Sequence, residues 1–244
     1  MPKCRADQLL VDRGLAESRA KAQALILAGL VYAGERRIDK AGETIADEIA
    51  IEVRGRDHPW VSRGGLKLAH ALEHFAIDVT DLVALDIGAS TGGFVDVLLT
   101  HGAAKVHAVD VGRGQLAWKL RQDPRVIIHD GVNARYLAAD KIGEPVDIVT
   151  CDASFIGLAT VLPAALALAK PRAQLVALIK PQFEAGPGAV GKGGVVRDTE
   201  THRAVCEAAA AWVVAQGWTV VGVTDSPITG SAGNKEFLLY AHRP

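Results

Sequence analysis

The fold class is decided by Leu85-Asp-Ile-Gly-Ala-Ser-Thr-Gly-Gly-Phe94, which reads as a buried strand, a glycine turn and a helix that begins at about Gly92. In a parallel α/β sheet, the first turn between strand and helix lies at the carboxyl edge, where ligands bind. Glycines let a ligand approach the backbone closely, and the first turn of a helix offers unpaired amides. The stretch therefore predicts a ligand-binding turn in an α/β domain.

Apolar, strand-like runs alternate with amphipathic helical stretches around this turn. The runs cover residues 83–87, 106–109, 126–128, 146–151, 175–179, 218–223 and 237–240. This alternation is typical of a mainly parallel sheet with helices on both faces, as in a Rossmann-like domain. A loop without a helix joins the last two runs, and this predicts an antiparallel hairpin at the sheet edge.

Residues 1–57 follow a different pattern and are predicted to form a small α+β domain. A short helix should end at Gly14, and a second helix should begin after the cap Ser18 and end at Gly29. A strand that turns at Gly34 should follow. A unit of this size has a marginal core, so we expect contact with a partner or ligand to stabilise it.

Residues 58–65 are expected to form a linker to a larger domain at residues 66–244. Pro59 interrupts regular structure there, and Gly64-Gly65 should add backbone freedom. A helix is expected from Leu66 to Phe75.

The net charge of the chain is −1, so any nucleic-acid site must be a local patch. Residues 1–37 carry seven Lys or Arg against four acids, whereas residues 38–57 carry six acids against three bases. From charge alone, a basic RNA-binding patch and an ordinary solvated surface describe the first segment equally well.

The sequence argues against a disulfide-bonded, a metal-binding or a membrane protein. The three cysteines, Cys4, Cys151 and Cys206, are far apart and odd in number, and this argues against disulfides and metal sites. The sequence shows neither a signal peptide nor an apolar run long enough to span a membrane. We therefore expect no metal, no membrane association and a cytoplasmic location.

The glycine turn favours S-adenosylmethionine over a dinucleotide. Its glycines fall at 88, 92 and 93, which is not the Gly-x-Gly-x-x-Gly spacing that holds a pyrophosphate. S-adenosylmethionine carries an ammonium and a sulfonium, which favour a nearby carboxylate such as Asp86. Asp110, at the end of the next strand, could bind a ribose diol, and Asp130, after the third, an adenine amine. Alone, each acid would more often be a turn former, but the three together favour a binding site.

Two further strands end in groups that could react. The fourth strand runs into Cys151-Asp-Ala-Ser-Phe155 and the fifth into Ile179-Lys-Pro-Gln-Phe183. Lys180 should point into the crevice, where it could act as a base or form a structural ion pair with Asp152. Lys67 and Glu236 could complete a charged cluster, although each alone reads as a surface residue.

Together these motifs closely resemble the TlyA family, which is also labelled hemolysin A and is allied to the FtsJ-type ribose methyltransferases. The resemblance covers nearly the whole chain. It rests on Ser62-Arg-Gly-Gly-Leu-Lys67, Asp86-Ile-Gly-Ala-Ser-Thr-Gly-Gly-Phe94, Asp110-Val-Gly-Arg-Gly-Gln-Leu-Ala-Trp118, Asp152-Ala-Ser-Phe155, Lys180-Pro-Gln-Phe-Glu184 and Gly233-Asn-Lys-Glu236.

The resemblance implies an S4-like RNA-binding domain at residues 1–57 and a Rossmann-like, S-adenosylmethionine-dependent methyltransferase domain after it. Arg5-Ala-Asp-Gln-Leu-Leu and Gly14-Leu-Ala-Glu-Ser-Arg-Ala-Lys-Ala match the helical motif of the small domain, whereas Ala33 replaces the usual asparagine of its turn. It implies a catalytic tetrad of Lys67, Asp152, Lys180 and Glu236. The expected cofactor-binding residues are Asp86, Gly88, Ser90, Gly92, Gly93, Phe94, Asp110, Asp130 and Asp152.

The implied activity is methylation of a ribose 2′-hydroxyl, of a cytidine, in ribosomal RNA or a ribosomal subunit. Chains as short as this one look restricted to the large-subunit RNA. In the expected reaction the 2′-oxygen attacks the methyl carbon, Lys180 takes the proton, and Lys67 and Glu236 orient the reacting groups. Phosphate contacts are expected from Arg5, Arg19, Lys21, Arg36, Arg37, Arg54, Arg56 and Arg63.

Three alternatives remain open. A nicotinamide-dependent oxidoreductase would bind a dinucleotide in calorimetry, whereas a methyltransferase would bind S-adenosylmethionine. A membrane-lytic protein, as the hemolysin label suggests, would lyse red cells at low concentration. A non-catalytic RNA-binding protein would keep the fold without the chemistry, and only an activity assay separates it from an enzyme. The sequence leaves the oligomeric state and the modified nucleotide unknown.

Overall fold

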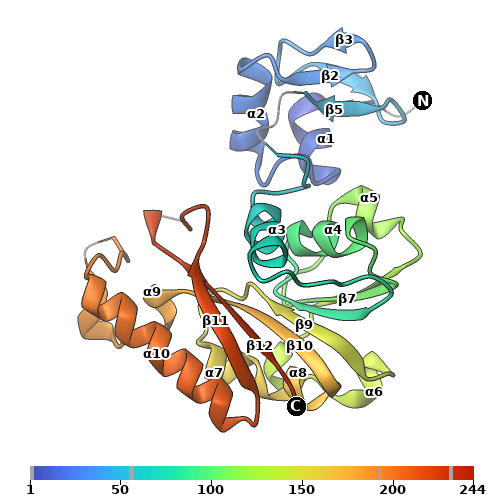
Figure 1. Cartoon of the computed structure of the whole chain (residues 1–244). Coiled ribbons are helices and arrows are strands. Elements are labelled where there is room, and N and C mark those ends of the chain that lie inside the picture. Colours follow the sequence, from blue (N-terminus) through green and yellow to red (C-terminus); the bar gives the residue numbers. More distant parts are fainter. Residues whose placement is uncertain (1–2, 55–57, 192, 231–232) are drawn as a thin grey trace.

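The structure, a computed structural model, describes residues 3–54, 58–191, 193–230 and 233–244. It contains a small N-terminal unit, drawn in blue in Figure 1, and a larger α/β unit. Within its described residues the small unit consists of β1 (Lys3–Arg5), α1 (Ala6–Asp12), α2 (Arg19–Leu27), β2 (Val31–Ala33), β3 (Arg36–Arg37), β4 (Thr44–Ala46) and β5 (Ile51–Val53).

The small unit has the α+β architecture that the sequence predicts. β1 pairs antiparallel with β4, and β2 lies between β3 and β5 in a three-stranded sheet. Leu9, Leu10, Ile26 and Ile38 are fully or almost fully buried in a core of its own. The predicted cap is confirmed, since the Ser18 hydroxyl accepts a hydrogen bond from the third residue of α2 at 3.2 Å.

A seven-stranded sheet forms the centre of the larger unit. Its strands in chain order are β6 (Val83–Ile87), β7 (Lys105–Asp110), β8 (Val126–Asp130), β9 (Val146–Cys151), β10 (Ala169–Ile179), β11 (Thr219–Asp225) and β12 (Phe237–His242). They lie in the order β11-β12-β10-β9-β6-β7-β8. The pairings from β10 to β8 are parallel, and β12 is antiparallel to both neighbours. The predicted parallel sheet with an antiparallel hairpin at its edge is confirmed.

Helices cover both faces of this sheet (Figure 1). The helical segments are α3 (Gly64–His74), α4 (Gly93–Thr100), α5 (Trp118–Arg121), η1 (Ala134–Tyr136), α6 (Ala139–Ile142), α7 (Leu158–Val161), α8 (Pro163–Ala167), α9 (Pro181–Glu184), η2 (Pro187–Ala189) and α10 (Thr199–Ala215). Neighbouring residues of one strand belong to two different apolar cores: Leu85 packs with α7, α8 and α10, and Ala84 packs with α3 and α4. This explains the continuous apolar runs, because strands buried on both faces have no polar side.

The segment expected to be a flexible linker is packed against the larger unit. The Val61 amide donates to Asp96 Oδ2 of α4 at 2.8 Å, and α3 begins at Gly64, before the expected Leu66. A Cβ on Gly65 would lie 2.5 Å from Cβ of Trp60. The prediction that Gly64-Gly65 gives the chain freedom is therefore wrong, since Gly65 is required by close packing.

The small unit touches the larger one through Gly14, which has a φ of +65°. A Cβ there would lie 2.6 Å from Cα of Ala117, and the Trp118 amide donates to the Arg13 carbonyl at 3.4 Å. Gly14 thus ends α1, as expected from the sequence, and also allows two backbones to meet.

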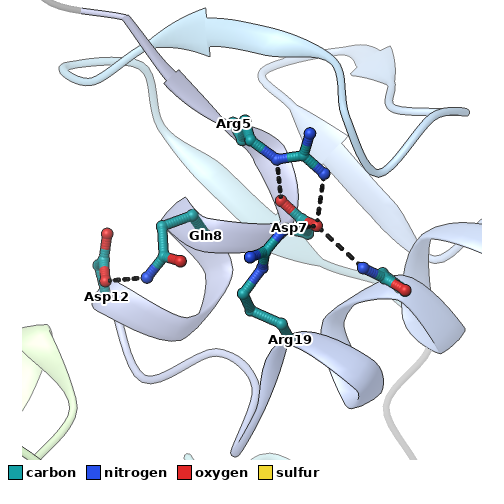
Figure 2. Close-up of polar contacts among 6 residues, drawn as sticks. Arg5, Asp7, Gln8, Asp12 and Arg19 are labelled. Carbon is teal, nitrogen blue, oxygen red and sulfur yellow. Dashed lines mark hydrogen bonds and ion pairs between the residues drawn. The ribbon is translucent and has the colours of Figure 1, made fainter.

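A buried carboxylate organises the small unit (Figure 2). Asp7 is fully buried and accepts two hydrogen bonds from the Arg5 guanidinium, at 3.0 and 2.9 Å, and one from Arg19 at 3.1 Å. Gln23 of α2 donates a fourth at 3.0 Å. The hydrogen bonds from Arg5 dominate and hold the pKa of Asp7 well below its usual range. The carboxylate therefore ties α1 to α2.

We predict that Asp7→Asn destabilises the small unit by about 1–3 kcal/mol, because it removes a buried hydrogen-bonded charge. Hydrogen exchange of the α1 and α2 amides at pH 7 would measure this loss. Asp12→Asn is the matched control, since Asp12 is exposed and, within the described part of the chain, its side chain binds Gln8 alone, at 2.7 Å. Equal protection in the two variants would show that Asp7 does not organise the unit.

Candidate active site

A cavity of about 890 Å³ lies at the carboxyl edge of the sheet. Its wall includes Gly88 after β6, Asp152 after β9 and Lys180 after β10, together with Lys67 of α3 and Glu236 just before β12. The small unit contributes a further part of the wall. Parallel strands bring their carboxyl ends to one edge, and β12 begins there because it is antiparallel. Topology thus gathers side chains that are far apart along the chain.

The four side chains of the predicted tetrad meet in this cavity, in a row of alternating charge. Lys180 Nζ lies 2.7 Å from Oδ1 of Asp152. Lys67 Nζ lies 3.5 Å from Oδ2 of the same carboxylate and 2.8 Å from Oε2 of Glu236. None of the four side chains is more than 20% exposed.

Pairing makes the burial of these charges tolerable, since two ammonium groups face two carboxylates and their formal charges cancel. Removing one member would leave an unpaired charge in a poorly hydrated place, which costs about 3–5 kcal/mol in buried pairs. The ion pair of Lys180 with Asp152, expected from the sequence as an alternative to a catalytic lysine, is present. The pair lines the cavity, so the ion pair is compatible with a catalytic role of Lys180, which remains a prediction.

Ser154 is a member of the site that sequence reasoning missed. Its hydroxyl accepts a hydrogen bond from Lys180 Nζ at 2.8 Å, and the carbonyl of Asp152 accepts another at 3.1 Å. Its place in Asp152-Ala-Ser-Phe155, directly after a strand end, is the signal that could have revealed it.

The next residue, Phe155, was also missed. It is 89% exposed although it is aromatic, and its φ is +65°, which is strained for a bulky side chain. Its ring centroid lies 5.1 Å from that of Phe183, which lines the cavity. An aromatic surface thus stands beside the charged row.

The glycines of the turn serve different purposes. Gly88 has a φ of +82°, lines the cavity, and lies so close to Ala153 that a Cβ would be 2.9 Å from its Cα. Ser90, Gly93 and Phe94 also line the cavity, as expected of cofactor-binding residues.

Gly92 is explained by packing and is absent from the described lining of the cavity. A Cβ on it would lie 2.3 Å from a methyl of Leu120 and 2.7 Å from one of Leu116. Gly92 therefore has a steric role beside Leu116 and Leu120, and its cofactor contact remains a prediction.

Asp86 is 1% exposed, and its two oxygens differ. Oδ1 accepts a hydrogen bond from the Thr150 hydroxyl at 2.7 Å, whereas Oδ2 has no hydrogen-bond partner among the residues that the structure describes. Burial raises the pKa of Asp86 to about 7. A buried carboxylate with one oxygen that accepts no hydrogen bond from the described residues suits a cationic ligand, as expected from the sequence.

Asp110 and Asp130 hold backbone amides at the strand ends. Asp110 accepts from the amides of Ser90, at 2.8 Å, and Gly112, at 2.7 Å. Asp130 accepts from the Gly114 amide at 2.9 Å and pairs with Arg121 at 3.4 Å. Both acids therefore shape the loop that follows β7, and any direct cofactor contact remains a prediction.

The cations predicted to bind RNA fall into two groups. Arg5, Arg19, Arg36, Arg37 and Arg54 form ion pairs within the small unit: Arg5 and Arg19 with Asp7, Arg36 with Glu43, Arg37 with Asp39, and Arg54 with Glu35 and Glu52. Lys21 and Arg63 line the cavity instead. Arg56 lies outside the described residues. The predicted basic patch is thus partly neutralised, and two cations remain beside the charged row.

Within the described ranges, no group of three or more His, Cys, Asp or Glu is arranged to hold a metal. No helix found there is long and apolar enough to span a bilayer. Cys4, Cys151 and Cys206 are free thiols, and burial raises the pKa of Cys151 to about 12.

Comparison with known proteins agrees with this geometry. The FtsJ-like methyltransferase family matches residues 60–243, and the S4 domain matches residues 4–48. "16S/23S rRNA (cytidine-2'-O)-methyltransferase TlyA" of Mycobacterium tuberculosis is 49% identical over 98% of this chain and 89% of its own. "Hemolysin A" of Brachyspira hyodysenteriae is 40% identical over 97% of this chain and 98% of its own. A solved structure from Streptococcus thermophilus, described as a candidate hemolysin, has a TM-score of 0.77 at 45% identity and covers 100% of this chain and 89% of that one.

The fold and the charged row define an S-adenosylmethionine-dependent methyltransferase with an N-terminal S4 domain. The chain belongs to the FtsJ-like methyltransferase family, within its TlyA/hemolysin A branch. The resemblance seen in the sequence is confirmed. The nicotinamide-dependent oxidoreductase, the first alternative, does not agree with this family.

We predict that Gly93→Ala disrupts the site, because its Cβ would lie 2.4 Å from the Ser62 hydroxyl and 2.7 Å from the Gly65 amide. The start of α3, which carries Lys67, would have to move. Overpacking of this kind costs about 1–3 kcal/mol, measurable by urea unfolding. Gly186→Ala is the matched control, since its Cβ would meet open space. Unchanged stability in the first variant would contradict the packing role.

Proposed function

We propose that this protein methylates the ribose 2′-hydroxyl of a cytidine in ribosomal RNA. The observation that carries the proposal is the row Lys180–Asp152–Lys67–Glu236, which lines a cavity whose wall is partly made by the S4 domain. The relative from Mycobacterium tuberculosis is named for this reaction on both 16S and 23S rRNA. Of the two, we propose the large-subunit RNA as the preferred substrate, and the cytoplasm as the place of action.

S-adenosylmethionine supplies an electrophilic methyl group when it is bound. Asp86, with its unpartnered oxygen, would face the positive charge of the cofactor, and the turn from Gly88 to Phe94 would accommodate it at the cavity wall. Asp110 and Asp130 would support this site by fixing the loop after β7. The buried carboxylate and the close backbone approach at Gly88 fit such a group.

Lys180 is the residue we assign to the 2′-hydroxyl. Its nitrogen faces the cavity: as a neutral amine it would take the proton of the hydroxyl, and as an ammonium it would stabilise the developing negative charge on the oxygen. Asp152 fixes the direction of the amine from one side. Lys67, held by Glu236, fixes Asp152 from the other, so the row keeps the reacting amine in place.

RNA would approach through the open side of the cavity. Lys21 of the S4 domain and Arg63 of the connecting segment line the cavity and could hold backbone phosphates. The exposed ring of Phe155 offers a stacking surface for an unpaired base. The remaining predicted RNA contacts, Arg5, Arg19, Arg36, Arg37 and Arg54, would act from the outer face of the S4 domain.

Ribosomal subunits from cells that lack this protein provide the test substrate. The purified protein and labelled S-adenosylmethionine should transfer methyl groups to them, and mapping of 2′-O-methyl sites in both rRNAs should identify a cytidine. Failure to label either subunit would refute the proposal. Red-cell lysis by the purified protein would support the lytic alternative, which so far has only names of relatives in its favour.

We predict that Lys180→Ala abolishes methyl transfer and leaves the Kd for S-adenosylmethionine within a few-fold of wild type, because the lysine serves the ribose and not the cofactor. Filter-binding of labelled RNA product and calorimetry would measure the two quantities. Lys170→Ala is a control, since Lys170 lies at the start of β10, far from Lys180 at its end, and among the described residues it pairs with Asp147 of β9. Near wild-type turnover of the Lys180 variant would contradict the role assigned to Lys180 at the ribose 2′-hydroxyl.

We also predict that cofactor affinity depends on pH through Asp86, whose pKa is about 7. The ionised carboxylate is the form that attracts a cation, so affinity should rise with pH. Between pH 6 and 8 the ionised fraction grows from about a tenth to about nine-tenths, and Kd should fall about tenfold. Asp86→Asn, measured by calorimetry at the same pH values, corrects for titration of the cofactor itself. The same pH dependence in both proteins would refute this role.

A further inference from the structure

The ammonium group of Lys180 has three hydrogens and three acceptors around it. Oδ1 of Asp152 lies at 2.7 Å, the carbonyl oxygen of Asp152 at 3.1 Å, and the hydroxyl oxygen of Ser154 at 2.8 Å. A lysine ammonium donates three hydrogen bonds and accepts none. The Asp152 carbonyl and the Ser154 hydroxyl accept hydrogen bonds from the amine, and Oδ1 of Asp152 contacts it as an ion pair, so an incoming substrate oxygen competes with these oxygens for the N–H groups.

Of the three acceptors, Ser154 is the one that can give way. Asp152 is also bound by Lys67, and its carbonyl belongs to a backbone whose amide donates to Ile87 at 3.0 Å. Ser154 is exposed, lines the cavity, and can rotate its hydroxyl about a single bond. Its own hydrogen is donated to none of the described residues. The hydroxyl therefore lines the cavity next to the amine that it binds.

The backbone that positions Ser154 is strained at the next residue. The chain reverses at Phe155, whose φ of +65° is unfavourable for a residue with a bulky side chain. The loop is secured beyond this point, where the Leu158 amide donates to Glu184 Oε1 at 2.7 Å. Strain that the surroundings maintain beside reacting groups is a mark of a functional constraint.

We propose that Ser154 is a positioning residue that presents Lys180 to the ribose 2′-oxygen. This rests on the proposed function and adds a residue to it. The hydroxyl keeps one N–H of the lysine turned toward the cavity, and the 2′-oxygen takes its place when RNA enters. Without the hydroxyl, the ammonium turns wholly toward Asp152 and meets the substrate less often in the reactive orientation.

The test compares Ser154→Ala and Ser154→Thr with wild type, using subunits from cells that lack the protein. The alanine variant should lower kcat about tenfold, the effect of one hydrogen bond to a charged group, with the KM for subunits and the Kd for S-adenosylmethionine within twofold. The threonine variant keeps the hydroxyl and should stay within threefold of wild-type kcat. Thr160→Ala removes an exposed hydroxyl nearby and should change nothing.

Full kcat in the alanine variant would overturn the proposal. A loss confined to KM or to cofactor affinity would also overturn it, because Ser154 would then contact the RNA or the cofactor instead of positioning Lys180. Thermal unfolding checks the fold of each variant, and a threonine variant as slow as the alanine one also overturns it. Failure of the proposed function looks different, since wild type would then label no rRNA, or Lys180→Ala would remain active.

Discussion

The contact of Lys67 with two carboxylates is the interaction on which the site depends. It joins Asp152, which follows β9, to Glu236, which precedes β12, and so couples two distant segments of the sheet edge to α3. α3 can reach that position because Gly65 and Gly93 leave no side chain between its first turn and its neighbours. Electrostatics and sterics therefore act together, since the charges attract only where the backbones can approach.

The net charge of the whole chain is −1, and this is compatible with an RNA substrate because a small domain lies beside the cavity. Most of the predicted cations in the S4 domain are paired with nearby acids, which lowers the net field of the domain. Lys21 and Arg63 line the same cavity as the charged row. Two well-placed cations beside the reacting groups would position RNA more effectively than a uniformly basic surface, because phosphate contacts fix register and orientation.

The aspartates at the strand ends share a location and differ in what they do. Asp110 and Asp130 satisfy backbone amides of the loop after β7, so they act through the shape of that loop. Asp86 is enclosed by protein, and one of its oxygens has no hydrogen-bond partner among the described residues, which makes its negative charge costly. The same residue type at the same sheet edge thus supports the backbone in two strands, and in the third it is the proposed partner of a cationic ligand.

The family resemblance implied the S4 domain and the four members of the proposed tetrad, whereas the sequence by itself determined the sheet and the glycine turn. Strands buried on both faces leave continuous apolar runs, and caps and turns need particular residue types, so these features are local and legible. Tertiary structure alone decided that Gly65 and Gly92 serve packing, that five arginines are paired within the S4 domain, and that Ser154 binds Lys180. Each of these depends on a distance between residues that the chain keeps apart, and no local pattern encodes such a distance.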